Sequence, residues 1–419
     1  MAKTPQFLKP RLRLFLSADI IGSTALKQTP RDALSASTVE WFPVLQGFYL
    51  ETQRAFLGGW IRSLPEDTKE RQLHWGPDPE FWKVIGDEIL FTKELTDSHQ
   101  LMNVLACWIN AIDAARESIR KVDRRLDIKC TAWTAGFPLM NKEVALPRNF
   151  NIADAPVTDY FKEGGRLLNE RYAKKANDAK IAVDYIGPSI DIGFRLCQFA
   201  SARKFILSVG VAYILSQSNR KASDVRVTRF RYDGASVLKG VFGGIHYPIF
   251  WIDLAKPGDL ALLEDKLTKP IECTSDDVHK YCDKFFDDAS PYTFKPFIIS
   301  QTENDLKEKP DNYEKDIENI KKNYGLEIIG DKASEKAAEA ETPPQGTHAV
   351  AQTPALKASA ATEETPLAIS AINFAELFNE IRKVTKERAS PSATKKVSDC
   401  GENTTPEGKD EKDENRDKD

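Results

Sequence analysis

Long hydrophobic runs are absent from this chain of 419 residues. No apolar stretch approaches the roughly 20 residues needed to cross a bilayer, and the apolar stretch after Arg13 is interrupted by Asp19. The sequence therefore predicts neither a membrane span nor a signal peptide. Cysteines are also few, and the six form no Cys-x-x-Cys pair. This argues against a disulfide framework or a zinc cage, so we expect a cytoplasmic protein.

An excess of charge of one sign is missing as well. Lys and Arg total 59 against 63 Asp and Glu, which leaves a net charge of −4. A protein that coats nucleic acid or anchors itself to an anionic membrane carries a strong positive excess. We therefore expect neither nucleic acid nor a membrane among the partners. A phosphate-binding loop of the P-loop type is also lacking, which argues against a P-loop nucleotidase.

Aromatic residues are abundant but unevenly distributed. They make up 10% of the chain and hydrophobic residues 41%, enough for a substantial core. All seven tryptophans lie at or before Trp251, whereas residues 331–419 contain only Phe374 and Phe378 as aromatics. Such a segment cannot bury enough apolar surface to offset its ordering entropy, so we predict a disordered tail. Within it, residues 366–389 could form an amphipathic helix, either idle or docking on a partner or on the protein's own body.

The rest of the chain alternates strand and helix patterns irregularly. Apolar runs predict strands at 12–20, 81–85, 88–91, 127–135, 205–209 and 246–252, and helical periodicity predicts helices at 39–56, 101–112 and 190–200. A hairpin centred on Gly86-Asp87 joins two strands, which favours an α+β sandwich over a doubly wound parallel sheet. Ser23 or Thr24 is expected to cap a helix after the first strand. Residues 254–330 predict short helices on the flank of the domain.

Two aspartates stand where apolar strands meet glycine turns. Asp19 closes the first strand shortly before Gly22, and Asp87 follows Gly86 in the hairpin. A carboxylate at the end of a strand is costly to desolvate unless it meets a cation, and a pair suits divalent metal ions with phosphate as the remaining ligand. Either aspartate alone would be expected merely to cap a turn. Together with the residues around them, the two predict a two-metal site acting on a triphosphate.

Four motifs follow one another between residues 10 and 253. They are Phe-Leu-Ser-Ala-Asp-Ile-Ile-Gly-Ser-Thr at 15–24, Lys-Val-Ile-Gly-Asp at 83–87, Ile-Gly-Pro-Ser-Ile-Asp-Ile-Gly-Phe-Arg-Leu at 186–196 and Val-Leu-Lys-Gly-Val at 237–241. In this order they resemble the motifs of class III nucleotidyl cyclases. The first motif and the Trp-Lys before Gly-Asp-Glu are most similar to the bacterial pyrimidine cyclases of Pycsar antiphage systems.

The resemblance implies a fold and a division of the chain. It covers residues 10–253, which we expect to form a class III cyclase-like catalytic domain with a mixed, mainly antiparallel sheet flanked by helices. Residues 254–330 would be a helical extension, and the tail 331–419 lies outside the resemblance. In this family the metal aspartates and the helix arginine of one site come from different chains. A homodimer with two equivalent sites at its interface is therefore implied.

The resemblance also implies a role for each matching residue. Asp19 and Asp87 would bind two divalent metal ions, Mn²⁺ or Mg²⁺, with the backbone carbonyl of Ile20 as a further ligand. Arg195 would stabilise the charge that develops on the α-phosphate, a role suited to its planar guanidinium. Lys239 would hold the β- and γ-phosphates as a point charge.

The residues expected to contact the base and the ribose do not determine which nucleotide is bound. Lys83 and Asp184 fall where purine cyclases read the base. A lysine donor beside a carboxylate acceptor fits adenine, uracil and cytosine alike, and only weakly disfavours guanine. Asp191 stands where the family has the asparagine that orients the ribose, and an ionised carboxylate can accept but not donate a hydrogen bond. Four nearby tryptophans are expected to pack in the core rather than stack on a base: Trp41, Trp60, Trp75 and Trp82.

These observations lead to one main hypothesis about function. It is a nucleotide cyclase that converts UTP into cyclic UMP and diphosphate by two-metal catalysis. The product would be a second messenger in antiphage defence and would activate a separate cyclic-nucleotide-responsive effector. Only the resemblance to pyrimidine cyclases favours UTP, so cytidylate and adenylate cyclases stay open. A further alternative is an inactive cyclase-fold scaffold. The activating signal and the effector stay open too.

Overall fold

The structure is a computed structural model, and it describes residues 5–28, 41–148, 159–173, 180–217, 225–256, 258–268, 273–298, 306 and 308–324. The expected disordered tail at 331–419 and the possible helix at 366–389 lie outside these residues. The domain boundaries at 10–253 and 254–330 stay predictions.

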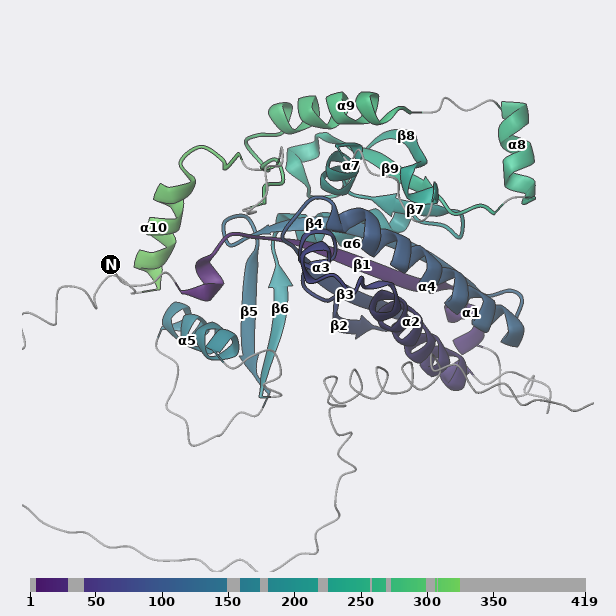
Figure 1. Cartoon of the computed structure of the whole chain (residues 1–419), viewed down its shortest axis with the longest axis horizontal. Helices are drawn as coiled ribbons and strands as arrows, with labels where there is room; N and C mark the ends of the chain where they lie inside the picture. The colour runs from purple at the N-terminus through teal and green to yellow at the C-terminus, as the bar shows by residue number, and fades with distance from the viewer. Residues whose placement is uncertain are drawn as a thin grey trace, which may run out of the picture. The chain divides into compact units, whose positions relative to one another are not determined.

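A seven-stranded sheet lies at the centre of the fold (Figure 1), with the strand order β2-β3-β1-β4-β7-β9-β8. The strands are β1 Arg11–Ile21, β2 Glu80–Ile85, β3 Glu88–Leu95, β4 Asp127–Phe137, β7 Lys204–Leu207, β8 Phe230–Val237 and β9 His246–Asp253. Neighbouring strands pair antiparallel throughout, except that β4 and β7 are parallel. A separate antiparallel ribbon consists of β5 Lys142–Pro147 and β6 Ile181–Ile186. The expected α+β class with a mixed, mainly antiparallel sheet is confirmed.

Helices cover both faces of this sheet. The first seven helices along the chain are α1 Ser23–Lys27, α2 Trp41–Ser63, α3 Thr68–His74, α4 Gln100–Val122, α5 Tyr160–Ala173, α6 Pro188–Leu196 and α7 Val209–Ser216. Of these, α5 packs on strand β5 of the ribbon. On one face, Phe56 of α2 and Trp108 of α4 pack against Phe91 of β3. On the other, Phe15 of β1 belongs to a buried cluster that includes Ile190 of α6. Because side chains alternate along a strand, β1 supplies both layers of the core.

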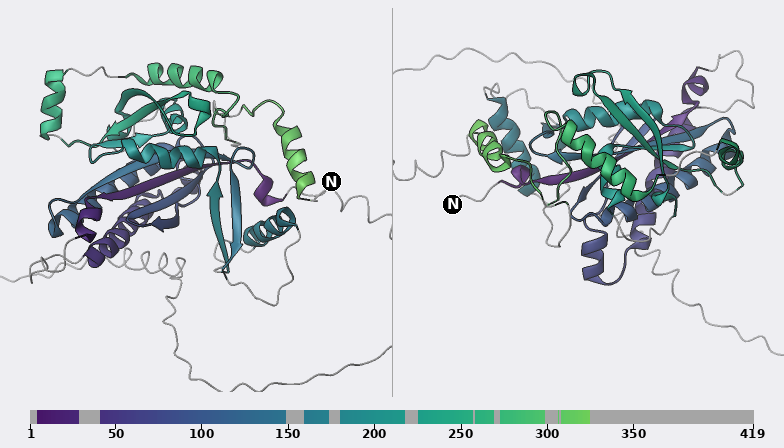
Figure 2. Two further views of the ribbon diagram at one scale, coloured as in Figure 1. Left: turned by 180° about the vertical axis from the view of Figure 1, so that it is seen from behind. Right: turned by 90° about the horizontal axis from the view of Figure 1, so that it is seen from above.

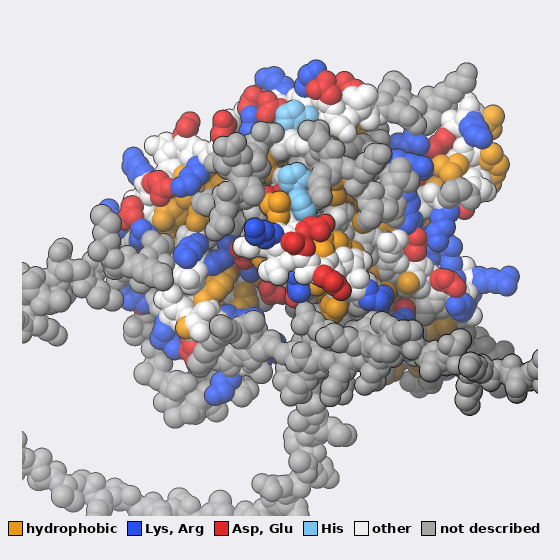
Figure 3. Space-filling view, in the orientation of Figure 1, with side chains coloured by type: hydrophobic (Ala, Val, Ile, Leu, Met, Phe, Trp, Pro, Cys, Tyr) orange, Lys and Arg blue, Asp and Glu red, His pale blue; other side chains and the backbone are white. Residues whose placement is uncertain are grey.

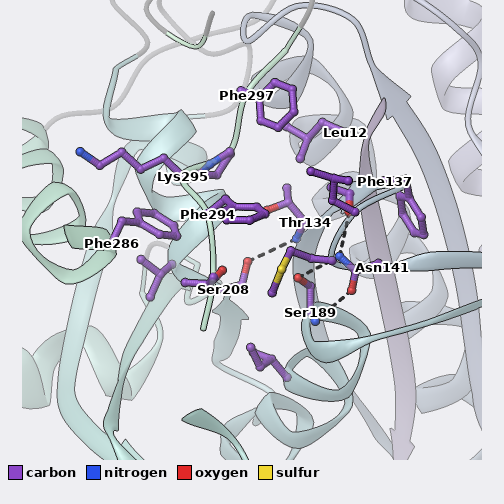
Figure 4. Close-up of a pocket in the computed structure, with 18 of the residues that line it drawn as sticks. Leu12, Thr134, Phe137, Asn141, Ser189, Ser208, Phe286, Phe294, Lys295 and Phe297 are labelled. Atoms are coloured by element: carbon purple, nitrogen blue, oxygen red, sulfur yellow. Dashed lines mark hydrogen bonds between the residues drawn. The ribbon is translucent and has the colours of Figure 1, made fainter. Parts of the chain in front are cut away.

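Three more helices follow the sheet, as residues 254–330 predict: α8 Leu260–Thr268, α9 Ser275–Asp288 and α10 Tyr313–Asn323. In Figures 1 and 2 they follow one another around the outside of the sheet rather than within it. Phe286 of α9 packs on Tyr213 of α7. The segment after α9 closes a cavity at the end of the sheet, where Figure 4 shows Phe294 beside Thr134. The extension is thus built onto the same core.

Two composition-based expectations can be compared with the described residues. Within these ranges, no helix has both the length and the apolar character that a bilayer span requires. The five described cysteines are all free thiols. On the face drawn in Figure 3, acidic and basic side chains are interspersed, as the near-balance of charge leads one to expect.

Candidate active site

The two strand-end aspartates lie together at one end of the sheet. Asp19 lies near the C-terminal end of β1. It pairs with Glu88 of β3 on one side and with Lys129 of β4 on the other. Asp87 occupies the tight turn between β2 and β3, next to Gly86, whose φ of 64° is natural for glycine. Burial raises the pKa of Asp19; Lys129 opposes that shift and the neighbouring carboxylate of Asp87 adds to it. The two carboxylates are therefore close enough to affect each other's protonation.

Two lysines neutralise these carboxylates in the structure. Lys129 Nζ lies 3.0 Å from Asp19 Oδ2, and Lys27 Nζ lies 3.3 Å from Asp87 Oδ1. Ser23 Oγ also donates to Asp87 Oδ2. Burial works to raise the pKa of Asp87, but the bond from Ser23 and the charge of Lys27 outweigh it, and the pKa is lowered. Neither lysine could be identified from the sequence, because their pairing with the aspartates depends on strand register and on the position of α1.

The prediction that Ser23 or Thr24 caps α1 is wrong. Gly22, with a φ of 90°, is the N-cap residue, and no side chain caps the helix. The reason is that the Ser23 hydroxyl is already used by Asp87. The residue that resembled a helix cap is instead part of the carboxylate site.

The donor set at Asp19 and Asp87 fits divalent metal ions. Each carboxylate keeps 25% of its side chain exposed, so both can be reached from solvent. Hard cations such as Mg²⁺ or Mn²⁺ take oxygen ligands and commonly bind through one or two carboxylates plus substrate phosphates. No cluster of three or more His, Cys, Asp or Glu able to hold a metal occurs in the described ranges. Ile20, the predicted backbone ligand, follows Asp19 in β1 and pairs with Ile128.

Glu88 is a third carboxylate at this end of the sheet, and it was not among the residues predicted from the sequence. It accepts a hydrogen bond from Ser17 of β1, and Cys197 Sγ lies 3.8 Å from its Oε1. Burial raises the pKa of Glu88. Since Cys197 directly follows α6, this contact ties the end of α6 to the strand that begins beside Asp87.

The predicted phosphate-binding residues also come together, in a separate cleft. Its lining consists of Asp191, Phe194, Arg195, Gln198 and Lys239. Asp191 and Arg195 stand four residues apart on α6 and therefore share one face of the helix. Lys239 follows β8 in a turn. The Nε atom of Arg195 is buried and has no hydrogen-bond partner, an arrangement that favours an anion in the cleft.

Close packing sets the position of α6. A Cβ atom on Gly193 would lie 2.2 Å from the ring of Trp133 in β4, so only glycine lets the helix sit this close to the sheet. Phe194 packs on the same tryptophan, with ring centroids 5.5 Å apart. Arg195 is thus carried by a helix seated directly on the central sheet.

The two predicted base-reading residues are bonded to each other. Lys83 Nζ of β2 donates to both carboxylate oxygens of Asp184 in β6, at 2.8 and 3.0 Å. Trp82 Nε1 donates to Asp184 Oδ1 at 3.0 Å, and Lys83 Nζ lies 4.3 Å from the centroid of the Trp82 ring. Trp82 therefore contacts both members of the pair, Asp184 through a hydrogen bond and Lys83 through a cation–π contact. The position of Trp82 directly before Lys83 is the sequence feature from which this role could have been predicted.

The other tryptophans behave in two ways. Trp60 is fully buried, and Trp75 packs on it with ring centroids 4.8 Å apart, as expected for core residues. Trp41 is 44% exposed, so the expectation of core packing is wrong there. Trp41 is the first described residue of α2, and its ring packs edge-on against that of Phe42.

Comparisons with known proteins give matches to structures only. No family model and no curated protein matches the chain. The adenylyl cyclase CyaB from P. aeruginosa is 12% identical, with a TM-score of 0.35 over 59% of this chain and 97% of that chain. The guanylyl cyclase Cya2 is 12% identical, with a TM-score of 0.31 over 60% of this chain and 96% of that one.

A third match is the guanylate cyclase domain of RhGC from Catenaria anguillulae, solved in complex with GTP. It is 12% identical, with a TM-score of 0.33 over 58% of this chain and 97% of that chain. Identities and scores this low describe a likeness of fold and carry nothing about function.

Proposed function

We propose that this protein is a nucleotide cyclase, which converts a ribonucleoside triphosphate into the 3′,5′-cyclic monophosphate and diphosphate. The observation that carries the proposal is the pair of facing carboxylates, Asp19 and Asp87, at the end of the sheet. Arg195, with its buried and unpartnered Nε, and Lys239 supply the complementary phosphate-binding cleft. Two carboxylates for metal and two cations for phosphate are what cyclisation of a triphosphate requires.

The residues divide the chemistry between them. Asp19 and Asp87 would hold two Mg²⁺ or Mn²⁺ ions, which would favour ionisation of the ribose 3′-hydroxyl and neutralise the leaving diphosphate. Arg195 donates to the α-phosphate oxygens while the 3′-oxygen, whose proton passes to solvent, bonds to the α-phosphorus and the bond to the diphosphate breaks. Lys239 binds the departing phosphates, and Asp191 accepts a hydrogen bond from a ribose hydroxyl.

We place each complete site between two copies of the chain. Within one chain, Asp19 and Asp87 pair with lysines, while Arg195 and Lys239 line a different cleft. Exposed apolar side chains adjoin both halves: Val84 and Ile85 stand beside Gly86-Asp87, and Val237 precedes Lys239 by two residues. A homodimer that buries these side chains would bring the two halves together, and two-fold symmetry would make two equivalent sites.

For the base, UTP is the substrate we propose. Lys83 would donate to O4 of uracil and Asp184 would accept from N3–H, with Trp82 fixing both groups. The resemblance to Pycsar pyrimidine cyclases supports this choice, since cytosine and adenine satisfy the same pair. The same resemblance supports cyclic UMP as a cytoplasmic second messenger in antiphage defence that acts on a separate effector.

The decisive experiment uses the purified full chain with each of the four triphosphates and Mn²⁺. Cyclic product and diphosphate are measured by chromatography and mass spectrometry, with Asp87→Asn as the matched control. We expect cyclic UMP to form fastest and the control to form none. Cyclic AMP or cyclic CMP as the main product would correct the base and leave the enzyme class intact. If no triphosphate gives a product, the inactive-scaffold alternative is favoured. The replacement of the family's asparagine by Asp191 would then be a mark of lost activity.

A further inference from the structure

A polar cavity lies where the ribbon of β5 and β6 meets the central sheet, and Figure 1 shows the ribbon standing beside that sheet. Its lining comes from β1, β2 and β3 on one side and from β5, β6 and the end of α5 on the other. Its volume is about 320 Å³, at the lower end of the range of small-molecule sites. Among the described residues that line it, none belongs to the carboxylate pair or to the cleft of Arg195. The cavity is therefore separate from the proposed catalytic site.

Charges of both signs line this cavity in balance. The described lining contains three arginines and three glutamates: Arg13, Arg148, Arg171, Glu80, Glu94 and Glu143. A simple anion in the cavity would meet the carboxylates, and a simple cation would meet the guanidinium groups. A ligand that carries one charge of each sign is complementary to both sets.

Arg13 of β1 is the most deeply buried of these cations. Its side chain is only 7% exposed, and its Nε and Nη1 atoms find no hydrogen-bond acceptor among the described residues. Carboxylates surround it at distances longer than hydrogen bonds: Glu143 at 3.6 Å, and Glu80 and Glu94 at 3.9 Å each. A buried donor without an acceptor costs free energy, and a ligand carboxylate would offset that cost.

Arg171, near the end of α5, adds a second donor of the same kind. Its Nη1 atom is buried and also lacks an acceptor in the part of the chain that the structure describes. Burial raises the pKa of Tyr185 in the cavity wall, and four neighbouring charges act on the same phenol: Arg13, Glu143, Glu80 and Arg171. The charged side chains of the lining therefore converge on one place.

Aromatic rings complete the walls of the cavity. They belong to Phe81, Trp82, Tyr172 and Tyr185. The hydroxyl of Tyr172 is hydrogen-bonded to the carboxylate oxygens of Glu143, at 2.8 and 2.6 Å. Glu80 and Glu94, whose side chains are 53% and 29% exposed, are therefore the more accessible carboxylates. The rings offer apolar surface to the body of a ligand and π faces to a cation.

We propose that this cavity binds a free α-amino acid. Arg13 and Arg171 hold its carboxylate, because a guanidinium fork matches the planar carboxylate group. Glu80 and Glu94 accept hydrogen bonds from its ammonium group, and its side chain packs on the aromatic walls. The two charges of an α-amino acid are attached to one carbon atom. They therefore require a cation and an anion side by side, as Arg13 and its surrounding carboxylates are.

Binding in the cavity would reach the base-reading pair through Trp82. This residue lines the cavity, and its Nε1 atom donates to Asp184 at 3.0 Å. An amino acid packed on the indole would restrain it and, with it, the carboxylate of Asp184. The rate of cyclisation or the preference for a base would then respond to the amino acid. This consequence rests on the proposed function, but the binding itself does not.

Isothermal titration calorimetry of the full chain with each standard amino acid tests the binding without using activity. We expect at least one of them to bind, one molecule per chain, with a dissociation constant below about 1 mM. Acetate and methylamine carry the two charges separately, so each should bind at least about tenfold more weakly, as loss of one charge-assisted hydrogen bond predicts.

Three variants test the residues that hold the two charges. Glu80→Gln removes a carboxylate at a half-exposed position, and Arg171→Gln removes a guanidinium group near the end of α5. Each should weaken binding of the amino acid about tenfold. Arg13→Lys keeps the buried charge but loses the planar fork, and should weaken binding at least as much. Circular dichroism establishes that each variant is folded, and the first two decide the matter if Arg13→Lys is not.

Matched controls remove the same groups away from the cavity. Arg166→Gln lies on the same helix, where Arg166 is 59% exposed, and Glu117→Gln lies on α4, where Glu117 is 73% exposed. Both should bind the amino acid as the unsubstituted chain does, and so should Asp87→Asn in the proposed catalytic site. Because cyclase activity is not measured, a failure of the proposed function leaves this result standing.

Four results would overturn the proposal. They are the absence of binding by any amino acid, equal affinity for acetate or methylamine, unchanged affinity in both Glu80→Gln and Arg171→Gln, and loss of binding in Asp87→Asn. The second would show that the cavity reads a single charge. The last would assign the amino acid to the catalytic carboxylates instead of the cavity.

Discussion

The two halves of the proposed site differ in how their charges are satisfied. In the carboxylate half, Asp19 and Asp87 already hold cations, the ammonium groups of Lys129 and Lys27. In the cleft on α6, the Nε atom of Arg195 is buried without a partner. The carboxylate half therefore has both charges paired, although burial still raises the pKa of Asp19, whereas the arginine half keeps a desolvated donor that only an incoming acceptor would satisfy. The comparison indicates that the single chain is preorganised to bind an anion in the cleft on α6, rather than to bind metal ions at the aspartates.

Removing a carboxylate should have the largest effect. We expect Asp19→Asn and Asp87→Asn each to reduce turnover by at least about a thousandfold, because each deletes a proposed metal ligand and leaves the core volume unchanged. Rates of product formation under saturating Mn²⁺ measure this, and Mn²⁺ binding by electron paramagnetic resonance should weaken in parallel. Glu117→Gln, an exposed change on α4, is the control. Near-normal rates in either aspartate variant would refute the two-metal assignment.

Mixing two inactive variants tests whether the halves come from different chains. Asp87→Ala keeps Arg195, and Arg195→Ala keeps both aspartates, so a mixed dimer has one site with both lesions and one intact site. With free exchange at equal concentrations, half of the dimers are mixed, and activity should recover to roughly a quarter of that of the unsubstituted protein. Two affinity tags first establish that subunits exchange. No recovery despite exchange would contradict the shared site.

A smaller effect is expected at the base-reading pair. Trp82→Phe removes the indole donor to Asp184 and weakens the contact with Lys83, while an aromatic ring still fills the space. The Michaelis constant for the preferred triphosphate should rise about tenfold, the value expected from losing one charge-assisted hydrogen bond, with a smaller change in kcat. Trp41→Phe, at an exposed position, serves as the control. Equal loss of kcat for all triphosphates would show that Trp82 acts on the fold rather than on the base.

The smallest effect concerns a lysine that belongs to neither half. Lys93 of β3 is fully buried, donates to the carbonyl oxygen of Trp75 at 2.7 Å, and burial lowers its pKa to about 7. Between that value and the ordinary pKa of 10.5, the unfolded chain binds more protons than the folded one. The free energy of unfolding should therefore rise with pH from about 7 to 9, by up to about 1.4 kcal/mol per pH unit.

Urea denaturation of the unsubstituted protein and Lys93→Met across this range measures that slope. Other groups titrate in both proteins, so the informative quantity is the difference between them. The variant should lack the rise. Parallel curves for the two proteins would show that Lys93 keeps its proton in the folded state.

Sequence pattern predicts the parts of this fold that have continuous apolar runs. The strands β1, β4 and β9 are predicted within two residues of their observed bounds, because burial on a central sheet demands such runs. The start of α4 is predicted as closely, but the helix continues ten residues beyond the predicted end at 112. The edge strand β8 was missed, since its sequence from Phe230 to Val237 contains Arg231, Asp233 and Gly234. The predicted strand end at Val209 is wrong, because Val209 begins α7 after a Ser208 cap.

The site divides in the same manner. Asp19, Asp87 and Arg195 each sit in a motif that is local in the sequence, so each could be singled out from the sequence as a candidate. The partners that neutralise or orient them are set by tertiary structure. Lys129 reaches Asp19 only through the register of β1 and β4. The bond from Trp82 to Asp184 spans 102 positions along the chain. A local sequence pattern cannot predict a contact between residues so far apart in the chain.

The seating of α6 on Trp133 has a consequence for how the protein can diversify. Gly193 presses the helix onto the sheet, so Arg195 and Asp191 move only if the core moves. Lys83 and Asp184 stand on other elements, β2 and β6, and are joined to the helix through the contact of Trp82 with Phe194. Under the proposed function, the residues that bind phosphate are therefore held in place by the core. The residues that read the base lie on other elements and can be substituted separately. Substitutions at Lys83 and Asp184 could then change the nucleotide while the reaction stays the same.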